Sequence, residues 1–207
     1  MLNPVPVWPG NAQQYLCLGL AGVLSYFTVN GCWAADSQTI TFNITVPAVT
    51  CTVTPQNVTV SADIDGTAFV NKAWQTGGEQ NLNVGLSCQG NGAAGKLPKL
   101  TIAPAASTSV LAGSSDFLFR DSTSTSKGFG VAIFNKAAGS ITKNATTDMV
   151  KNGDTAWTGP TGASGADLTQ TITLSTGIAC GPQANCTPSK LEPGNLKASV
   201  IFNFAYN

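Results

Sequence analysis

The sequence predicts an all-β protein built as an immunoglobulin-like sandwich, and three observations support this class. Gly, Ser, Thr and Asn recur at close intervals, which favours strands and turns over helices. Several short segments alternate between apolar and polar residues with a period of two. No segment keeps an amphipathic helical period over three turns. About seven short strands in the 173 residues that remain after a predicted signal of 34 of the 207 residues are typical of such a sandwich.

The first 34 residues differ from the rest because they contain no charged side chain. The apolar stretch 15–29 has the length of the central region of a secretory signal, and it is short for a membrane span. We predict a signal peptide over 1–34, with cleavage before Ala35 and small residues preceding the cut. A lipoprotein signal ending at Cys32 and an uncleaved anchor are the alternatives.

The expected strands follow the signal in order. The first, 39–46, places Ile40, Phe42, Ile44 and Val46 on one face and polar residues on the other. Further strands are expected at 82–86, 100–102, 117–119, 128–134 and 168–174. The last and longest alternation closes the chain, and its apolar face comprises Leu196, Ala198, Val200, Phe202, Phe204 and Tyr206.

Four cysteines remain after the signal: Cys51, Cys88, Cys180 and Cys186. An even number behind a signal predicts disulfides and an oxidising compartment. Three pairings exist, and we favour Cys51–Cys88 with Cys180–Cys186. The second pair would close a tight turn, which we interpret as a local staple of the loop before the last strand.

The composition argues against several classes of function. The charged fraction is 10%, the net charge is +0 and there is no histidine. These values disfavour a nucleic-acid partner, a histidine-based catalytic site and most zinc sites. We therefore expect no enzymatic activity, no metal and no cofactor.

Both ends of the chain after the signal carry long apolar edge strands, which native sheets seldom leave bare. The two strands either pair with each other inside one sandwich, or each pairs with another chain.

The C-terminal sequence resembles the motif of pilus subunits of the chaperone–usher pathway. In GNLKASVIFNFAYN, Gly194 is fourteenth from the end, Tyr206 is penultimate, and apolar residues alternate between them. Cys51 and Cys88 have about the spacing of that family's disulfide. The segment ADSQTITFNITV resembles the donor segment of minor tip subunits of type 1 pili.

The resemblance implies an incomplete immunoglobulin-like sandwich that lacks its last strand and is completed by donor-strand exchange. It implies a donor extension at 35–49, with Ile40, Phe42, Ile44 and Val46 as inserted side chains, and a pilin domain at 50–207. The acceptor groove and chaperone-facing strand would run from Gly194 to Tyr206. The implied partners are a periplasmic chaperone, an outer-membrane usher, neighbouring subunits and a host receptor at the fibre tip, and the implied location is a fimbrium on the cell surface.

A self-contained carbohydrate-binding sandwich is the alternative from another class. Trp74 and Trp157 lie in polar, glycine-rich surroundings, and an exposed indole can stack on a sugar.

Overall fold

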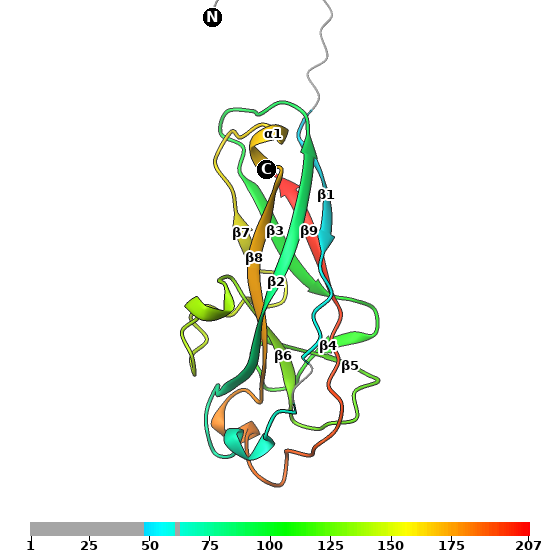
Figure 1. Cartoon of the computed structure of the whole chain (residues 1–207), viewed down its shortest axis with the longest axis vertical. Coiled ribbons are helices and arrows are strands. Elements are labelled where there is room, and N and C mark those ends of the chain that lie inside the picture. The colour runs from blue at the N-terminus through cyan, green and yellow to red at the C-terminus, as the bar shows by residue number, and fades with distance from the viewer. Residues whose placement is uncertain (1–47, 61–62) are drawn as a thin grey trace, which may run out of the picture. The chain divides into compact units, whose positions relative to one another are not determined.

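The computed structural model describes residues 48–60 and 63–207, which form two antiparallel sheets (Figure 1). The larger sheet has six strands in the order β1-β2-β8-β6-β5-β4, and the smaller has three in the order β7-β3-β9. The strands are β1 (Thr50–Pro55), β2 (Thr76–Gln89), β3 (Pro98–Pro104), β4 (Thr108–Val110), β5 (Leu118–Asp121), β6 (Gly130–Phe134), β7 (Thr155–Thr158), β8 (Gln170–Ala179) and β9 (Val200–Tyr206).

The helices in the described part of the chain are all short, as the lack of a helical period predicted. They are η1 (Gly66–Phe69), η2 (Ala138–Ser140), α1 (Gly165–Leu168) and η3 (Gln183–Asn185). The predicted all-β class is therefore confirmed, and the antiparallel sheets form a sandwich. The predicted signal peptide, the donor residues Ile40, Phe42, Ile44 and Val46, and most of the predicted extension lie outside the described residues.

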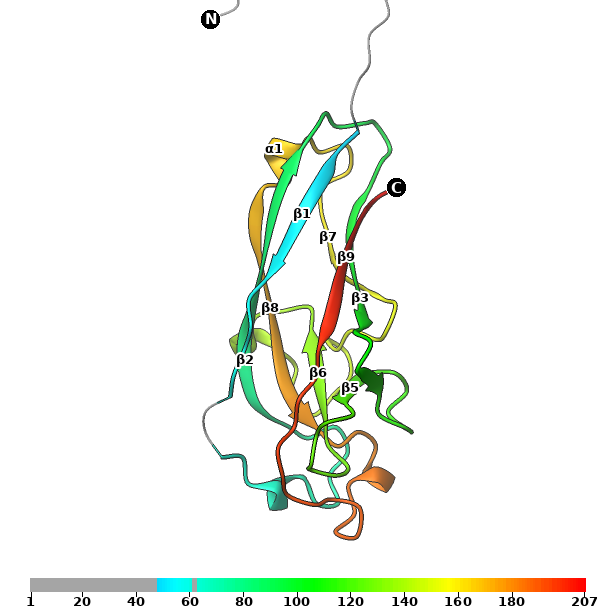
Figure 2. The ribbon, with the colours of Figure 1, turned by 90° about the vertical axis from the view of Figure 1, so that its right-hand side faces the viewer.

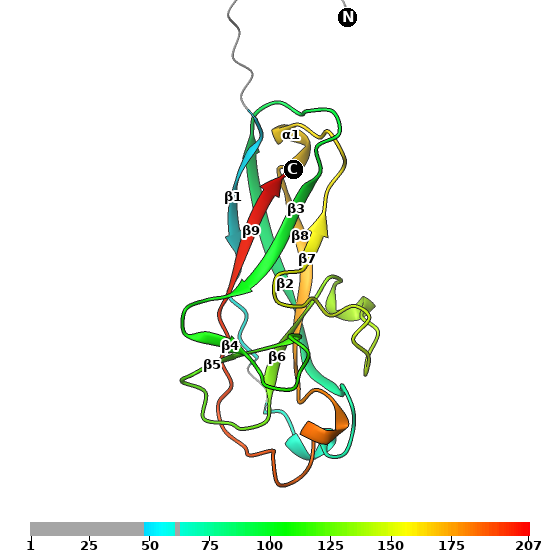
Figure 3. The ribbon, with the colours of Figure 1, turned by 180° about the vertical axis from the view of Figure 1, so that it is seen from behind.

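The main core fills the space between the two sheets. Leu82, Val84 and Leu86 alternate inward from β2, as the period of two predicted, and meet Leu100 and Ile102 of β3. Figure 3 shows the three-stranded sheet lying in front of β2 and β8. Burial of these side chains is worth about 1.5–3 kcal/mol each, so this layer dominates the stability of the sandwich.

Both predicted disulfides form. Cys51 of β1 bonds Cys88 of β2, and these two residues are direct partners in the strand register. Cys180 bonds Cys186 across the turn after β8. Two disulfides are typical of a protein from an oxidising compartment.

The expected strand at 168–174 is wrong at its start. Ser164 caps a short helix that ends at Leu168: its hydroxyl accepts the N–H of Asp167 (3.4 Å), and the Asp167 carboxylate accepts the N–H of Ser164 (3.0 Å). This reciprocal capping box satisfies two backbone donors that a strand would have to pair elsewhere. The strand β8 therefore begins only at Gln170.

The last predicted strand is regular over only part of its length. β9 pairs with β3 from Val200 to Tyr206, whereas 196–199 form no ladder with β3. Three short strands, β1, β4 and β7, were not expected from the sequence. Each has at most six residues, too few for a period of two to stand out among the many threonines and serines.

Candidate functional site: a groove beside the last strand

A long apolar groove runs between the segment that follows β1 and the segment that leads into β9. Its volume is about 1290 Å³, above the roughly 300–1,000 Å³ of typical small-molecule pockets. Figure 2 shows β1 and β9 facing each other as edge strands of the two different sheets. The groove lies between the two segments that continue these edge strands.

Apolar residues form the floor of the groove. They come from β2, β6 and β8 and from two flanking segments. Leu82, Ile133, Phe69 and Phe129 are buried, whereas Val131 and Ile178 are half-buried. The half-buried side chains are apolar surface that a partner could cover.

The C-terminal wall of the groove consists of five of the residues that the sequence singled out. Gly194, Leu196, Ala198, Val200 and Phe202 all line it. Phe202 is buried, and Leu196, Ala198 and Val200 are half-buried. Ile201, on the opposite face of β9, is 47% exposed, so the inward and outward faces alternate as predicted.

The backbone of β9 also presents an open edge. Asn207 and Leu97 exchange both backbone hydrogen bonds (N···O 3.3 and 2.6 Å), which fixes the pairing pattern because bonded and non-bonded pairs alternate along an antiparallel ladder. The odd-numbered residues of β9 therefore bond β3. The N–H and C=O groups of Val200, Phe202 and Phe204 point to the other edge, where no described strand pairs with them.

The same alternation continues before β9. The Lys197 carbonyl accepts the N–H of Asp121 (2.7 Å), and the Ser199 carbonyl accepts the N–H of Ala105 (2.9 Å). Both bonds point away from the groove. The polar backbone groups of Leu196 and Ala198 therefore face the groove, and within the described part of the chain none of them has a backbone partner.

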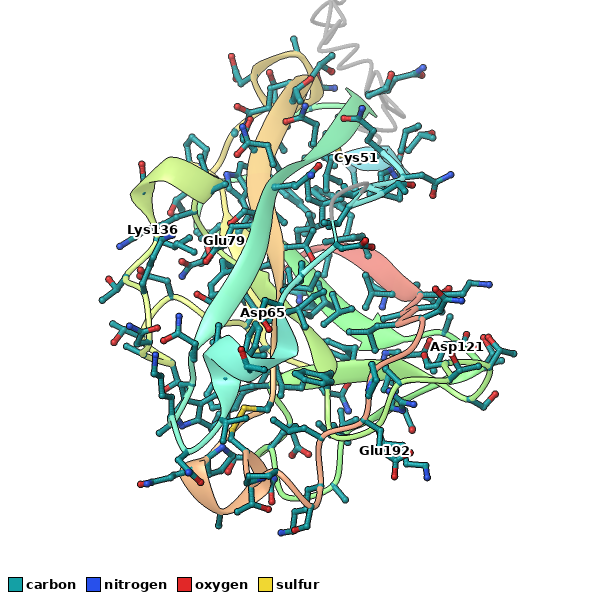
Figure 4. The ribbon with its side chains drawn as sticks, turned by 60° about the horizontal axis from the view of Figure 1, so that its bottom comes forward. Cys51, Asp65, Glu79, Asp121, Lys136 and Glu192 are labelled. Atoms are coloured by element: carbon teal, nitrogen blue, oxygen red, sulfur yellow. A yellow bond between two sulfur atoms is a disulfide. The ribbon has the colours of Figure 1, made fainter. Side chains whose placement is uncertain are left out.

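The opposing wall comprises residues within 55–60 and 63–70. Val58, Val60 and Ile64 are half-buried and line the groove, whereas Asn57 and Thr59 between them are exposed. Asp65 caps η1: its carboxylate accepts bonds from the hydroxyl (2.7 Å) and the N–H (2.9 Å) of Thr67, and these bonds lower the pKa of Asp65. Figure 4 places Asp65 on this wall and Glu192 on the C-terminal segment.

Side-chain hydroxyls, rather than a ladder, hold 195–199 in place. The Ser124 hydroxyl accepts the N–H of Lys197 (3.0 Å) and donates to its carbonyl (3.1 Å), so one side chain satisfies both backbone groups. The Thr125 hydroxyl accepts the N–H of Asn195 (2.9 Å), and that of Thr108 accepts the N–H of Ser199 (2.9 Å). This hydroxyl support leaves the groove-facing edge free.

Gly194 lies where the chain crosses the loop after β5. A Cβ on Gly194 would come within 2.5 Å of the Ser126 nitrogen, and the φ of Gly194 is +153°. Two residues earlier, Lys127 and Glu192 form a β-bridge and a salt bridge of 2.9 Å. The glycine thus permits the close approach that lets the loop support the wall.

Asp121 and Arg120 organise this supporting loop. The buried Asp121 carboxylate accepts bonds from the Ser107 hydroxyl (2.5 Å) and from the N–H (2.9 Å) and hydroxyl (2.7 Å) of Thr123, which lower its pKa to about 2. The Arg120 guanidinium donates to the carbonyls of Ser124 (3.0 Å), Ser126 and Phe129 (3.1 Å). The two side chains fix the loop that carries Ser124 and Thr125.

Two residues of the predicted acceptor strand lie outside the groove. Phe204 and Tyr206 pack against the main core, and the Tyr206 hydroxyl accepts the N–H of Ala93 and donates to the carbonyl of Ala163, both at 2.9 Å. Tyr206 therefore joins two loops beyond the end of the groove, which stops at Phe202.

The two tryptophans proposed for glycan contact lie in different clusters and are both half-buried. Trp74 packs edge-on against Phe117, with ring centroids 5.5 Å apart. Trp157 packs against the main core beside Leu100. The packing of both indoles adds no support to the carbohydrate-binding alternative.

Within residues 48–60 and 63–207, no three His, Cys, Asp or Glu residues are grouped so that they could hold a metal ion. No helix in that part of the chain is long and apolar enough to cross a membrane. Neither a family model nor a curated protein matches the chain.

Sequence reasoning missed the opposing wall and the supporting loop. Val58, Val60 and Ile64 show a short alternation after β1 that could have signalled the wall. Ser124 carries no such signal, because it acts through contacts with Lys197, 73 residues away. Arg120 and Asp121 carry none either, because their bonds to nearby loop residues depend on how the loop folds.

Proposed function

We propose that this chain is a structural subunit of a surface fimbria, assembled by the chaperone–usher pathway and polymerised by donor-strand complementation. The observation that carries the proposal is the groove, which combines an apolar floor with unpaired backbone groups along β9 and 196–199. Strand addition needs both features, because main-chain hydrogen bonds supply affinity and side-chain pockets supply specificity.

The chain also contains a segment with the matching pattern. Ile40, Phe42, Ile44 and Val46 are four apolar residues at a period of two. The groove edge likewise offers four residues at a period of two, which are Leu196, Ala198, Val200 and Phe202. We propose that Ile40, Phe42, Ile44 and Val46 of a second subunit fill the groove in the fibre.

The free energy gained by burying the inserted side chains makes an inserted strand essential for stability. Four buried apolar side chains at about 1.5–3 kcal/mol each amount to roughly 6–12 kcal/mol before the cost of ordering the strand. A whole domain has a net stability of about 5–15 kcal/mol. A subunit with an empty groove would therefore be marginal, which is why a periplasmic chaperone and an outer-membrane usher belong to the proposal as partners.

The test is a thermal melt of residues 35–207 with a flexible linker and a second copy of 37–46 added after Asn207. The control carries the same added segment with Ile40, Phe42, Ile44 and Val46 all replaced by Ser, so that the length is kept and no register shift can restore an apolar face. We expect the matched segment to raise the melting temperature by on the order of 20 °C over the control. Equal melting of both proteins would refute a self-compatible donor.

A further inference from the structure

The turn closed by Cys180 and Cys186 lies where the two walls of the groove meet. Both cysteines are fully buried and pack with Phe69 and Phe129, whose rings stand edge to face with centroids 5.5 Å apart. Ile64, Ile178, Leu191 and Leu196 pack around this group. Apart from the two cysteines, all of these residues also line the groove, so the disulfide cluster and the end of the groove are one structure.

Backbone hydrogen bonds tie the opposing wall to the disulfide turn. The N–H of Asn71 donates to the carbonyl of Cys186, and the N–H of Trp74 donates to the carbonyl of Gly181, both at 2.7 Å. Asn71 and Trp74 adopt left-handed backbone conformations, with φ of 58° and 54°. Such conformations are rare for side-chain-bearing residues, so the surrounding structure must enforce them.

The C-terminal wall leaves directly from the same turn. Lys190 extends its ammonium back to the carbonyl of Ala184 inside the turn (2.8 Å). Leu191 follows and lines the groove. One side of the turn therefore holds 64–74, and the other side begins the wall that reaches Gly194.

We propose that the Cys180–Cys186 disulfide is a clamp that fixes the spacing of the two groove walls. The end of the groove beneath it, lined by Ile64, Ile178, Leu191 and Leu196 and called the end pocket here, selects a branched apolar side chain at one end of the inserted strand. The proposal rests on the function proposed above. Antiparallel pairing gives better-aligned hydrogen bonds than parallel pairing. An inserted strand antiparallel to β9 would place its later residues at this end, so Val46 of a second subunit occupies the end pocket.

The test measures binding of three synthetic peptides to the full chain and to its Cys180→Ser/Cys186→Ser variant, at a temperature where both are folded. The peptides are 38–47, the same peptide with Val46→Ala, and a matched control with Ile40→Ala. We expect the variant to bind the first peptide and the Ile40→Ala peptide at least about tenfold more weakly than the parent chain. The Val46→Ala peptide should bind both proteins equally.

Two results would overturn the clamp. One is unchanged affinity for the first peptide after loss of the disulfide, and the other is equal weakening of all three peptides, which would show a general loss of structure. If the Ile40→Ala peptide alone loses its dependence on the disulfide, the antiparallel direction is wrong.

A second variant leaves the disulfide intact. Leu191→Phe narrows the end pocket. It should therefore lower the affinity for the 38–47 peptide and raise the affinity for the Val46→Ala peptide relative to the parent chain. Weakening of both peptides would contradict a pocket that selects by size.

Hydrogen exchange separates the clamp from the proposed function. Without the disulfide, the amides of Asn71 and Trp74 should lose protection by at least about tenfold, whereas that of Val84 in the core should not change. If the parent chain binds none of the peptides, the hypothesis that the subunit accepts its own donor segment fails, whereas hydrogen exchange still tests whether the disulfide is a clamp. Unchanged protection at Asn71 and Trp74 after removal of the disulfide would refute the clamp.

Discussion

The two halves of the C-terminal segment are held in different ways. From Phe202 to Tyr206, a regular ladder with β3, core packing and the Tyr206 hydroxyl fix the chain. From Asn195 to Ser199, the hydroxyls of Ser124, Thr125 and Thr108, together with separate backbone bonds to the carbonyls of this segment, take the place of a partner strand. Both arrangements anchor the backbone on one edge only. The groove lies beside 194–202, where inward side chains and the even-numbered backbone groups remain available to a partner.

The largest expected effect comes from the ladder half. In the chain fused to the 37–46 segment, Phe202→Ala should lower the free energy of unfolding by about 3–5 kcal/mol, because Phe202 is buried in the core. Denaturant unfolding measures this change. The neighbouring Ile201→Ala is the control, since Ile201 faces solvent, and it should cost well under 1 kcal/mol. Similar losses for the two variants would contradict the alternation of faces.

Gly194→Ala should destabilise the donor-free chain by about 1–3 kcal/mol, because the added Cβ collides with the backbone of Thr125 and Ser126. Gly139→Ala is a matched control, since nothing lies within 4 Å of a Cβ at that position. Chemical denaturation of both variants checks the prediction. A neutral Gly194→Ala would mean that the loop and the wall do not approach closely.

Ser124→Ala should lower the free energy of unfolding by about 0.5–1.5 kcal/mol, because it removes the hydroxyl that bonds both backbone groups of Lys197. Ser122→Ala is the control: Ser122 is exposed, and its hydroxyl bonds no described residue. Urea midpoints compared at equal m-values report the difference. Equal midpoints for the two variants would contradict the conclusion that the Ser124 hydroxyl supports 195–199.

The last expected effect is confined to acid pH. The pKa of Asp121 is about 2 in the folded chain, below its ordinary value of 3.8, because the Ser107 and Thr123 bonds favour the carboxylate. Asp121 therefore stabilises the fold above pH 4, and this contribution is lost as the pH falls from about 4 towards 2. The melting-temperature gap between the parent chain and Asp121→Asn should shrink across that range. A constant gap would contradict the prediction.

The same contrast explains how much the sequence could predict. The alternation in 196–206 correctly identified the inward face, because a period of two depends only on local order. The pairing of Cys51 with Cys88 and of Cys180 with Cys186 was the favoured one of three possible pairings, and the structure confirms it. The groove's other wall and the Ser124 support were not predictable, since they depend on which distant segments meet.

Amide hydrogen exchange along 195–202 tests the central claim most directly, measured on residues 48–207 with and without the fused 37–46 segment. In the donor-free chain, we predict protected amides at Lys197, Ser199 and Ile201 and rapid exchange at Leu196, Ala198, Val200 and Phe202. The fused segment should protect those four as well. Uniform protection before the segment is added would contradict an open groove, and unchanged exchange after its addition would contradict strand insertion.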